Sequence, residues 1–199
     1  MSEFDSRARD WDSNPLFLER AEAVAKALLE LVPVSREMKA LEYGAGTGLM
    51  SFLLSDRFSE IVMMDQSEEM VKVMQEKVAT SQIQNLKPLQ WDLVETDYRK
   101  GTFDCIFSQM VLHHITDIKD ILDKWLKMLN PGGYLAIADL YTEDGSFHQG
   151  ATDVHKGFSP KDLSNALLVA GFRNIEYKTC YLIKRNELEY PVFQLVAKI

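Results

Sequence analysis

The sequence has only two cysteines, Cys105 and Cys180, among 199 residues. Both lie in apolar, strand-like stretches, so we expect buried free thiols and neither a disulfide framework nor a cysteine metal site. No apolar run reaches the length of a membrane span, and the charged N-terminus does not have the pattern of a signal peptide. These absences predict a cytoplasmic protein with no membrane partner.

Clusters of basic residues are also missing. The chain carries 22 Lys and Arg against 30 Asp and Glu, a net charge of −8, and its basic residues are scattered among acids. This distribution argues against nucleic acid as a partner. The length suits one domain over residues 1–199, since no repeat, low-complexity tract or linker divides it, and we expect a monomer or a homodimer.

Hydrophobic periodicity predicts helices and strands that alternate along the chain. The expected helices are 15–32, 47–55, one capped by Ser67 up to 79, one that Thr116 caps and Asn130-Pro131-Gly132-Gly133 stops, and 160–170. The expected strands are 39–43, 60–64, 86–91, 103–108, 134–140, 174–183 and 191–198. This order predicts an α/β fold, a Rossmann-like three-layer α/β/α sandwich with a seven-stranded, mostly parallel sheet and an antiparallel last strand.

Two segments lie outside this alternation. Residues 1–34 form an N-terminal cap helix region, and residues 141–158 are polar, contain glycine and are too long for a simple connection. Loops of that length in compact domains are usually lids or binding loops. We therefore expect 141–158 to act as a lid or substrate loop, and both segments to set substrate choice.

The stretch "LEYGAGTG" places Gly44, Gly46 and Gly48 between the first expected strand and a helix. Missing side chains allow a ligand to lie against the backbone, and the helix N-terminus suits an anionic group. A dinucleotide fingerprint would need a third glycine where Leu49 stands, and no Gly-Lys-Ser/Thr phosphate loop follows. For the glycines alone, a tight strand-to-helix turn is the alternative.

Two acidic residues end the next two strands. Asp65 closes "IVMMD", where a carboxylate can accept both hydroxyls of a ribose. Asp92 in "LQWDL" closes the third strand and can accept a hydrogen bond from an exocyclic amine. With the glycine turn, these acids predict an adenosine ligand without a long phosphate chain.

These stretches, followed by "FDCIFSQMVLHHI" and "LKMLNPGGYLAIAD", resemble the successive motifs of class I S-adenosylmethionine-dependent methyltransferases. The resemblance covers residues 4–198 and is nearest to small-molecule enzymes of the ubiquinone/menaquinone-biosynthesis group. It implies S-adenosylmethionine as cofactor, S-adenosylhomocysteine as product, and methyl transfer to a small organic acceptor. The implied cofactor contacts are Trp11, Glu42, Tyr43, Gly44, Ala45, Gly46, Gly48, Asp65, Gln66, Trp91, Asp92, Leu93, Ser108 and Gln109.

In this resemblance Asp65 holds the ribose, Asp92 takes the adenine amine and the glycines border the methionine part. Glu42 orients the loop from beneath. Trp11 is expected to cover the cofactor, because an aromatic face suits a cation. Tyr43 departs from the family, which often has a small or aliphatic residue there.

Methyl transfer from a sulfonium needs a general base only where the nucleophile must lose a proton. The candidates are His113 and its neighbour His114, His148 and His155 in the long loop, and Asp139 and Tyr141 at the fifth strand's end. For each of them, packing or a structural role is the competing interpretation. We expect no metal, because no ligand pair shows a recognised spacing.

The acceptor is not fixed by the sequence. Residues 108–111 read Ser-Gln-Met-Val, and not the Asn/Asp-Pro-Pro-aromatic segment of enzymes that methylate DNA bases or glutamine. A small organic acceptor, attacked through O, N, C or S, remains. The alternatives are a non-catalytic S-adenosylmethionine- or S-adenosylhomocysteine-binding protein and a nicotinamide oxidoreductase, against which Leu49 argues.

Overall fold

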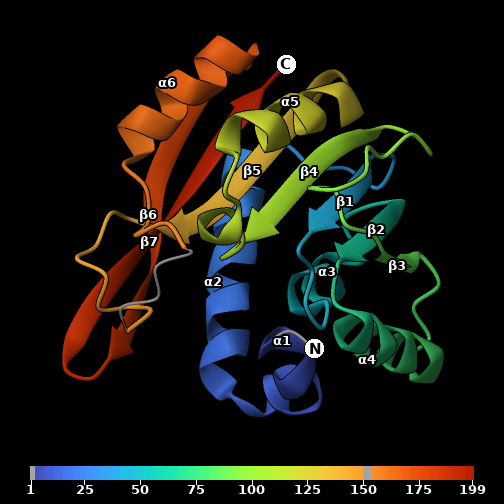
Figure 1. The fold of residues 1–199 in the computed structure, drawn as a ribbon. Helices are drawn as coiled ribbons and strands as arrows, with labels where there is room; N and C mark the ends of the chain where they lie inside the picture. The colour runs from blue at the N-terminus through green and yellow to red at the C-terminus, as the bar shows by residue number, and fades with distance from the viewer. Residues whose placement is uncertain (1–2, 150–153) are drawn as a thin grey trace.

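The computed structural model describes residues 3–149 and 154–199. One seven-stranded sheet runs through it in the order β3-β2-β1-β4-β5-β7-β6 (Figure 1). The strands are β1 (Lys39–Tyr43), β2 (Glu60–Asp65), β3 (Leu86–Gln90), β4 (Phe103–Gln109), β5 (Leu129–Leu140), β6 (Arg173–Arg185) and β7 (Leu188–Lys198). Strands β1 to β5 pair in parallel, and β7 is antiparallel to both neighbours, which confirms the predicted fold.

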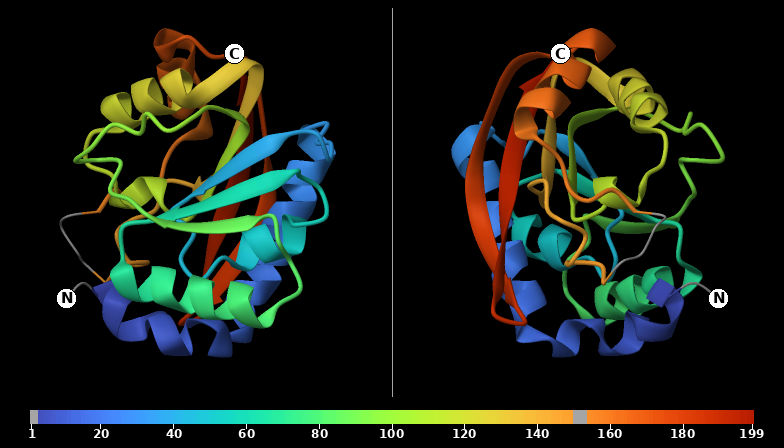
Figure 2. Two further views of the ribbon diagram at one scale, coloured as in Figure 1. Left: turned by 90° about the vertical axis from the view of Figure 1, so that its right-hand side faces the viewer. Right: turned by 60° about the vertical axis from the view of Figure 1, so that its left-hand side comes forward.

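Helices cover both faces of the sheet. α2 (Pro15–Leu31), α3 (Leu49–Leu54) and α4 (Glu68–Thr80) pack on one face, and α5 (Ile118–Met128) and α6 (Pro160–Ala170) on the other. The N-terminal α1 (Glu3–Arg7) and the 3-10 helix η1 (Ala8–Ser13) lie alongside α4 (Figure 2). A second 3-10 helix, η2 (Leu112–His114), follows β4.

Alternate residues of each inner strand enter different hydrophobic clusters. Ala40 packs in the cluster under α2, and Leu41 packs in the cluster under α5 with Trp125 and Phe193, both fully buried. The strand order reverses between β1 and β4. In open α/β sheets the ligand site lies at such a switch point, beyond the carboxyl ends of the strands.

The helix N-termini show the predicted capping, with one correction. The side chains of Asn14, Ser67 and Ser159 accept hydrogen bonds from backbone N–H groups of the first turn. Thr116 was expected to cap α5, but Asp117 does so, accepting from the Asp120 N–H at 2.9 Å. A carboxylate is at least as good a cap as a hydroxyl, and it also suits the positive end of the helix dipole.

Three other expectations need correction. The predicted helix 47–55 is shorter, since Gly48 with φ 81° is its N-cap. Asn130-Pro131-Gly132-Gly133 does end α5, but the segment then forms an irregular start of β5, where the register to β4 shifts. The second thiol, Cys180, is half-buried, whereas Cys105 is fully buried.

The long connection between β5 and α6 is joined at its ends. The Thr142 N–H donates to the Phe158 carbonyl at 3.0 Å, and the Glu143 N–H donates to the Lys156 carbonyl at 2.9 Å. Residues 150–153 of the expected lid, and residues 1–2 of the expected N-terminal cap region, lie outside the described residues. Within the described part, every helix is too short or too polar to cross a membrane.

A buried carboxyl joins β1 to α3. Glu42, 4% exposed, accepts hydrogen bonds from the N–H of Ser51 at 3.1 Å and from its hydroxyl. Burial raises the pKa of Glu42 to about 7, and the two bonds from Ser51 oppose this shift. The bond fixes the first turns of α3 against β1, so it holds the ends of the loop between them.

This raised pKa predicts a pH dependence of stability. A carboxyl with a higher pKa in the folded state contributes stability that is complete below its unfolded pKa and is lost as the pH rises through the folded value. Relative to Glu42→Gln, wild type should therefore lose about 3 kcal/mol of unfolding free energy between pH 4.5 and about 7. Urea denaturation across this window measures it, with the exposed Glu37→Gln as baseline. A constant difference between wild type and Glu42→Gln would contradict the buried-carboxyl account.

The β6–β7 turn predicts a stabilising substitution. Asn186 and Glu187, between the paired Arg185 and Leu188, have φ of 50° and 62°. Such two-residue turns favour Asn-Gly, because glycine adopts positive φ without strain. Glu187→Gly should raise the unfolding free energy by about 0.5–1 kcal/mol, measured by urea denaturation. Glu189→Gly, within β7, should lower it; equal effects of the two variants would show that turn strain is not the cause.

Candidate functional site

The loop of residues 44–48 joins β1 to α3. Gly44 and Gly46 have φ of 67° and 57°. A Cβ at Gly44 would overlap the Val111 side chain, so packing requires this glycine. At Gly46 the nearest atom to such a Cβ would be Trp11 Nε1, at 4.0 Å. The backbone of Gly46 is therefore the part of the loop that a ligand can approach.

Asp65 fixes the position of this loop. Its Oδ2 accepts from the Gly46 N–H at 2.7 Å, and its Oδ1 accepts from the Ser67 N–H at 2.9 Å. Burial raises the pKa of Asp65, while hydrogen bonds from Ser67 and Gly46 lower it. A carboxylate has about four acceptor positions, so further donors can bind beside these two.

Hydrogen bonds and an ion pair hold the N-terminal segment against the same loop. Asp12 accepts from the Thr47 hydroxyl at 2.5 Å and pairs with Lys77 Nζ at 2.6 Å. Lys77 also donates to the Thr47 carbonyl at 2.8 Å. The Ser67 hydroxyl donates to Asp5 Oδ1 at 2.5 Å. The segment that carries Trp11 is thus held over the loop by partners from α3's start and from α4.

Three other predicted contacts have structural roles. The Ala45 N–H donates to the Met64 carbonyl at 2.9 Å. A Cβ at Gly48 would come within 2.9 Å of Met63 Sδ. Tyr43 packs edge-on against Trp125 with ring centroids 5.4 Å apart, so its departure from the family pattern fills the core.

The end of β3 provides a second acidic group. Asp92 Oδ1 accepts from the N–H groups of Val94 and Glu95, which shapes the turn after the strand. Trp91 Nε1 donates to the Thr96 carbonyl at 3.0 Å. Trp91 and Leu93 flank Asp92. Leu93 is fully buried, so the half-buried Trp91 is the one of the two whose side chain a nucleobase could contact. Gln66 is exposed beside β3, where its carbonyl accepts from Gln90 Nε2.

The end of β4 holds polar atoms without partners. The buried Ser108 Oγ and Gln109 Oε1 have no hydrogen-bond partner within the described part of the chain. Ser108 lies opposite Tyr43 in the β1–β4 register, directly beside the start of the glycine loop. Met110 then turns the backbone with φ 58°. Orphaned atoms at this position are suited to bind a polar group of a ligand.

Beyond β4 lies a buried imidazole–carboxylate pair. His113 is 2% exposed and Asp139, on β5, is fully buried. His113 Nδ1 lies 2.7 Å from Asp139 Oδ1, and the His113 N–H donates to Asp139 Oδ2 at 3.2 Å. Asp139 Oδ1 also accepts from the Leu140 N–H at 2.7 Å. An Nδ1–H bonded to the carboxylate leaves Nε2 as the basic nitrogen.

Two further histidines meet this pair. The ring centroids of His114 and His148 lie 4.2 and 4.8 Å from that of His113. The ligand nitrogens of the three lie within 4.8 Å of one another, close enough to share an ion or to pass a proton through a water. Burial and the neighbouring His113 lower the pKa of His148. The sequence did not predict this cluster, because His148 is distant in the sequence from the adjacent His113 and His114.

His155 and Tyr141 lie differently. His155 Nε2 is hydrogen-bonded to the Ile115 carbonyl at 3.0 Å. The backbone N–H of His155 donates to the His113 carbonyl at 2.7 Å, so His155 anchors the end of the loop beside the cluster. The Tyr141 hydroxyl lies 3.0 Å from Thr179 Oγ1 on β6, with its ring on Phe193. The structure thus brings His113 and His148 together and ties Tyr141 to the outer strand.

Comparisons with known proteins agree with this geometry. Residues 41–137 match the family model described as "Methyltransferase domain". An uncharacterized methyltransferase of Schizosaccharomyces pombe is 30% identical over 155 residues, 70% of this chain and 55% of that protein. The chain therefore spans about half the length of this relative.

Solved structures show the same fold. A putative methyltransferase of Haloferax volcanii, in complex with the Trm112 methyltransferase activator, has a TM-score of 0.82 at 19% identity, covering 100% of this chain and 98% of that one. A SAM-dependent methyltransferase of Aquifex aeolicus has a TM-score of 0.73 at 22% identity, covering 98% of both. Residues 41–137 therefore carry a methyltransferase domain, and the order of the motifs and the fold resemble those of the class I S-adenosylmethionine-dependent methyltransferases.

Proposed function

We propose that this protein transfers a methyl group from S-adenosylmethionine to a small organic acceptor, and that His113 accepts the acceptor's proton. The observation that carries the proposal is the position of two groups at neighbouring strand ends. The Asp65–Gly46 bond builds an open backbone cradle at β1 and β2, and the buried His113–Asp139 pair stands at β4 and β5.

The residues present fit the cofactor. A Cβ at Gly46 would already contact Trp11 Nε1 at 4.0 Å, so glycine keeps the backbone free of a side chain there, and Asp65 retains acceptor positions for the two ribose hydroxyls. The orphaned Ser108 Oγ lies beside the glycine loop, where it can bind a polar group of the methionine part. Asp92 and its neighbours at the end of β3 would then border the adenine. The cofactor supplies a methyl group already activated by its sulfonium.

The protein's own contribution is to position the reactants, to exclude water from the site and to transfer the proton. Asp139 holds His113 through Nδ1, so Nε2 accepts the proton that a hydroxyl, amine, thiol or carbon acid must lose. Burial lowers the pKa of His148, which keeps this second imidazole neutral beside the first.

We assign the role of a lid to residues 1–34 and 141–158 within one domain of 199 residues. Asp12 holds the N-terminal part on Thr47 and Lys77, and His155 holds the end of the loop beside His113. These bonds support closure from two sides, which would exclude water from the transferred methyl group.

Asp65→Ala tests the cofactor site. The variant loses both the ribose acceptor and the bond to the Gly46 N–H, so affinity for S-adenosylhomocysteine should fall by about 1–3 kcal/mol. Isothermal titration measures this, with the exposed Asp97→Ala as the matched control. Unchanged affinity in Asp65→Ala would mean that the ribose is held elsewhere.

His113→Ala tests the base. Once an acceptor is found in a panel of hydroxyl, amine, thiol and carbon nucleophiles, kcat should fall by roughly 10²–10⁴-fold, while S-adenosylhomocysteine affinity stays within about twofold. Asp139→Asn should also lower kcat, because it disturbs the tautomer of His113. His155→Gln is the control, since it keeps a donor for the Ile115 carbonyl. A fully active His113→Ala would rule out the base, and binding of S-adenosylhomocysteine without any turnover would favour a non-catalytic binding protein.

A further inference from the structure

Arg20 is a buried cation with no carboxylate partner. It lies on α2 and is 9% exposed, and its Nε has no hydrogen-bond partner. The structure shows no ion pair to Arg20 from any described residue; its guanidinium carbon lies 5.1 Å from the Phe17 ring centroid. Burial of an unpaired charge is costly, and proteins accept the cost where the charge has a function.

Asp139, the carboxylate that interacts electrostatically with Arg20, is hydrogen-bonded to other groups. Burial lowers the pKa of Arg20 to about 10, while Tyr181 and Asp139 oppose this shift, so the guanidinium stays charged at neutral pH. Asp139 accepts three N–H groups, two from His113 and one from Leu140. The Tyr181 hydroxyl is hydrogen-bonded to Glu19. Neither group neutralises Arg20 directly.

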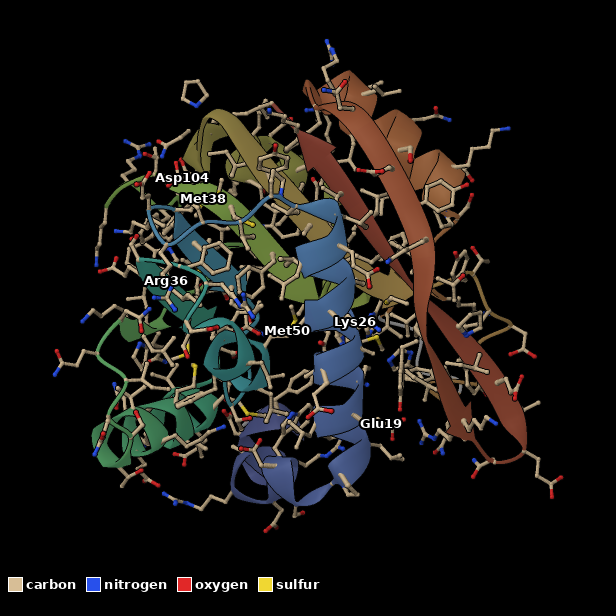
Figure 3. The ribbon with its side chains drawn as sticks, turned by 180° about the vertical axis from the view of Figure 1, so that it is seen from behind. Glu19, Lys26, Arg36, Met38, Met50 and Asp104 are labelled. Carbon is tan, nitrogen blue, oxygen red and sulfur yellow. The ribbon has the colours of Figure 1, made fainter. Side chains whose placement is uncertain are left out.

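Further unpartnered polar atoms lie on the same face of the sheet. Gln109 on β4 and Gln194 on β7 are both opposite Ala138 of β5, so they flank this small residue. Gln194 is 1% exposed, and the Oε1 atoms of both glutamines are buried without a partner. Ala138 belongs to the cluster under α2, the helix that carries Arg20. Figure 3 shows α2 crossing this face between α3 and the β6–β7 hairpin.

These groups lie near the end of β5 that carries the imidazole–carboxylate pair, since Asp139 directly follows Ala138. Because successive side chains of a strand point to opposite faces, the Asp139 carboxyl lies on the face away from α2. An acid bound by Arg20 would therefore reach the His113–Asp139 pair around the carboxyl ends of the strands.

Building on the proposed function, we propose that the methyl acceptor is a small carboxylic acid whose carboxylate is bound by Arg20. The planar guanidinium matches a carboxylate with two parallel hydrogen bonds, and one buried positive charge balances one negative charge. The unpartnered Oε1 atoms of Gln109 and Gln194 are acceptors, so they suit a hydroxyl or amine group of the same acid. With the carboxylate fixed at α2, the nucleophilic atom of the acid faces His113.

The first test needs no ligand. In Arg20→Met a flexible apolar side chain of similar length replaces the buried unpaired charge, so the unfolding free energy of the unliganded variant should equal or exceed that of wild type. Arg57→Met, which removes an exposed charge from the connection between α3 and β2, is the control. A clear loss of stability in Arg20→Met but not in Arg57→Met would show a structural role and overturn the proposal.

The second test uses matched ligands on protein loaded with S-adenosylhomocysteine. The probes are acetate, hexanoate, benzoate and phenylacetate, the uncharged amide of each, and phenyl phosphate. At least one acid should raise the melting temperature of wild type and of Arg57→Met but not of Arg20→Met, and its amide should have no effect. No response to any acid, equal responses to acid and amide, or a stronger response to phenyl phosphate would overturn the proposal.

Titration of the cofactor product separates this inference from the proposed function. S-adenosylhomocysteine should bind Arg20→Met within about twofold of wild type, because Arg20 contacts the acceptor. A loss of at least tenfold with S-adenosylhomocysteine but not with methylthioadenosine, which lacks the carboxylate, would assign Arg20 to the cofactor and overturn the acceptor site. Failure of wild type to bind S-adenosylhomocysteine would instead refute the proposed function itself.

Discussion

The hydrogen bond between the Asp65 carboxylate and the Gly46 N–H is the contact on which the site depends. It joins the end of β2 to the loop after β1 at 2.7 Å, and the same carboxylate also orders the start of α4 through the Ser67 N–H. Asp65 therefore has a structural role before any ligand arrives. Because residue 46 is glycine, no side chain of the loop stands between its backbone and Trp11.

Parallel register brings the remaining groups to the same edge of the sheet. Ser108 lies opposite Tyr43, and the next residue of β4, Gln109, lies opposite Ala138 on β5. This alignment sets the glycine loop near the strand ends that carry the His113–Asp139 pair. Methyl transfer demands little chemistry from the protein beyond such alignment, since the leaving group is already activated.

The sequence predicted the order of helices and strands along the chain, the glycine loop and the Ser67 cap because each rests on local patterns. It did not predict the contacts that close the site, because they join residues far apart in the chain. Asp12 and Thr47, for example, are hydrogen-bonded although they lie 35 residues apart. Arg20 lies within an amphipathic helix, where a charged residue is normally assigned to the solvent face.

The error at the start of α5 has a physical origin. Thr116 and Asp117 are both good caps, so the local sequence does not decide between them, and the folded structure uses Asp117. Tyr141 was placed at the site because it ends β5, and in the structure its ring and hydroxyl contact Phe193 and Thr179 of β7 and β6. Its role at the site stays a prediction.

The most direct measurement is a crystal structure with S-adenosylhomocysteine bound. The account predicts the nucleoside over the Gly46 backbone, with its ribose hydroxyls on Asp65 and its thioether directed toward the His113–Asp139 pair. A ligand bound elsewhere on the protein, or a ribose that makes no contact with Asp65, would contradict it.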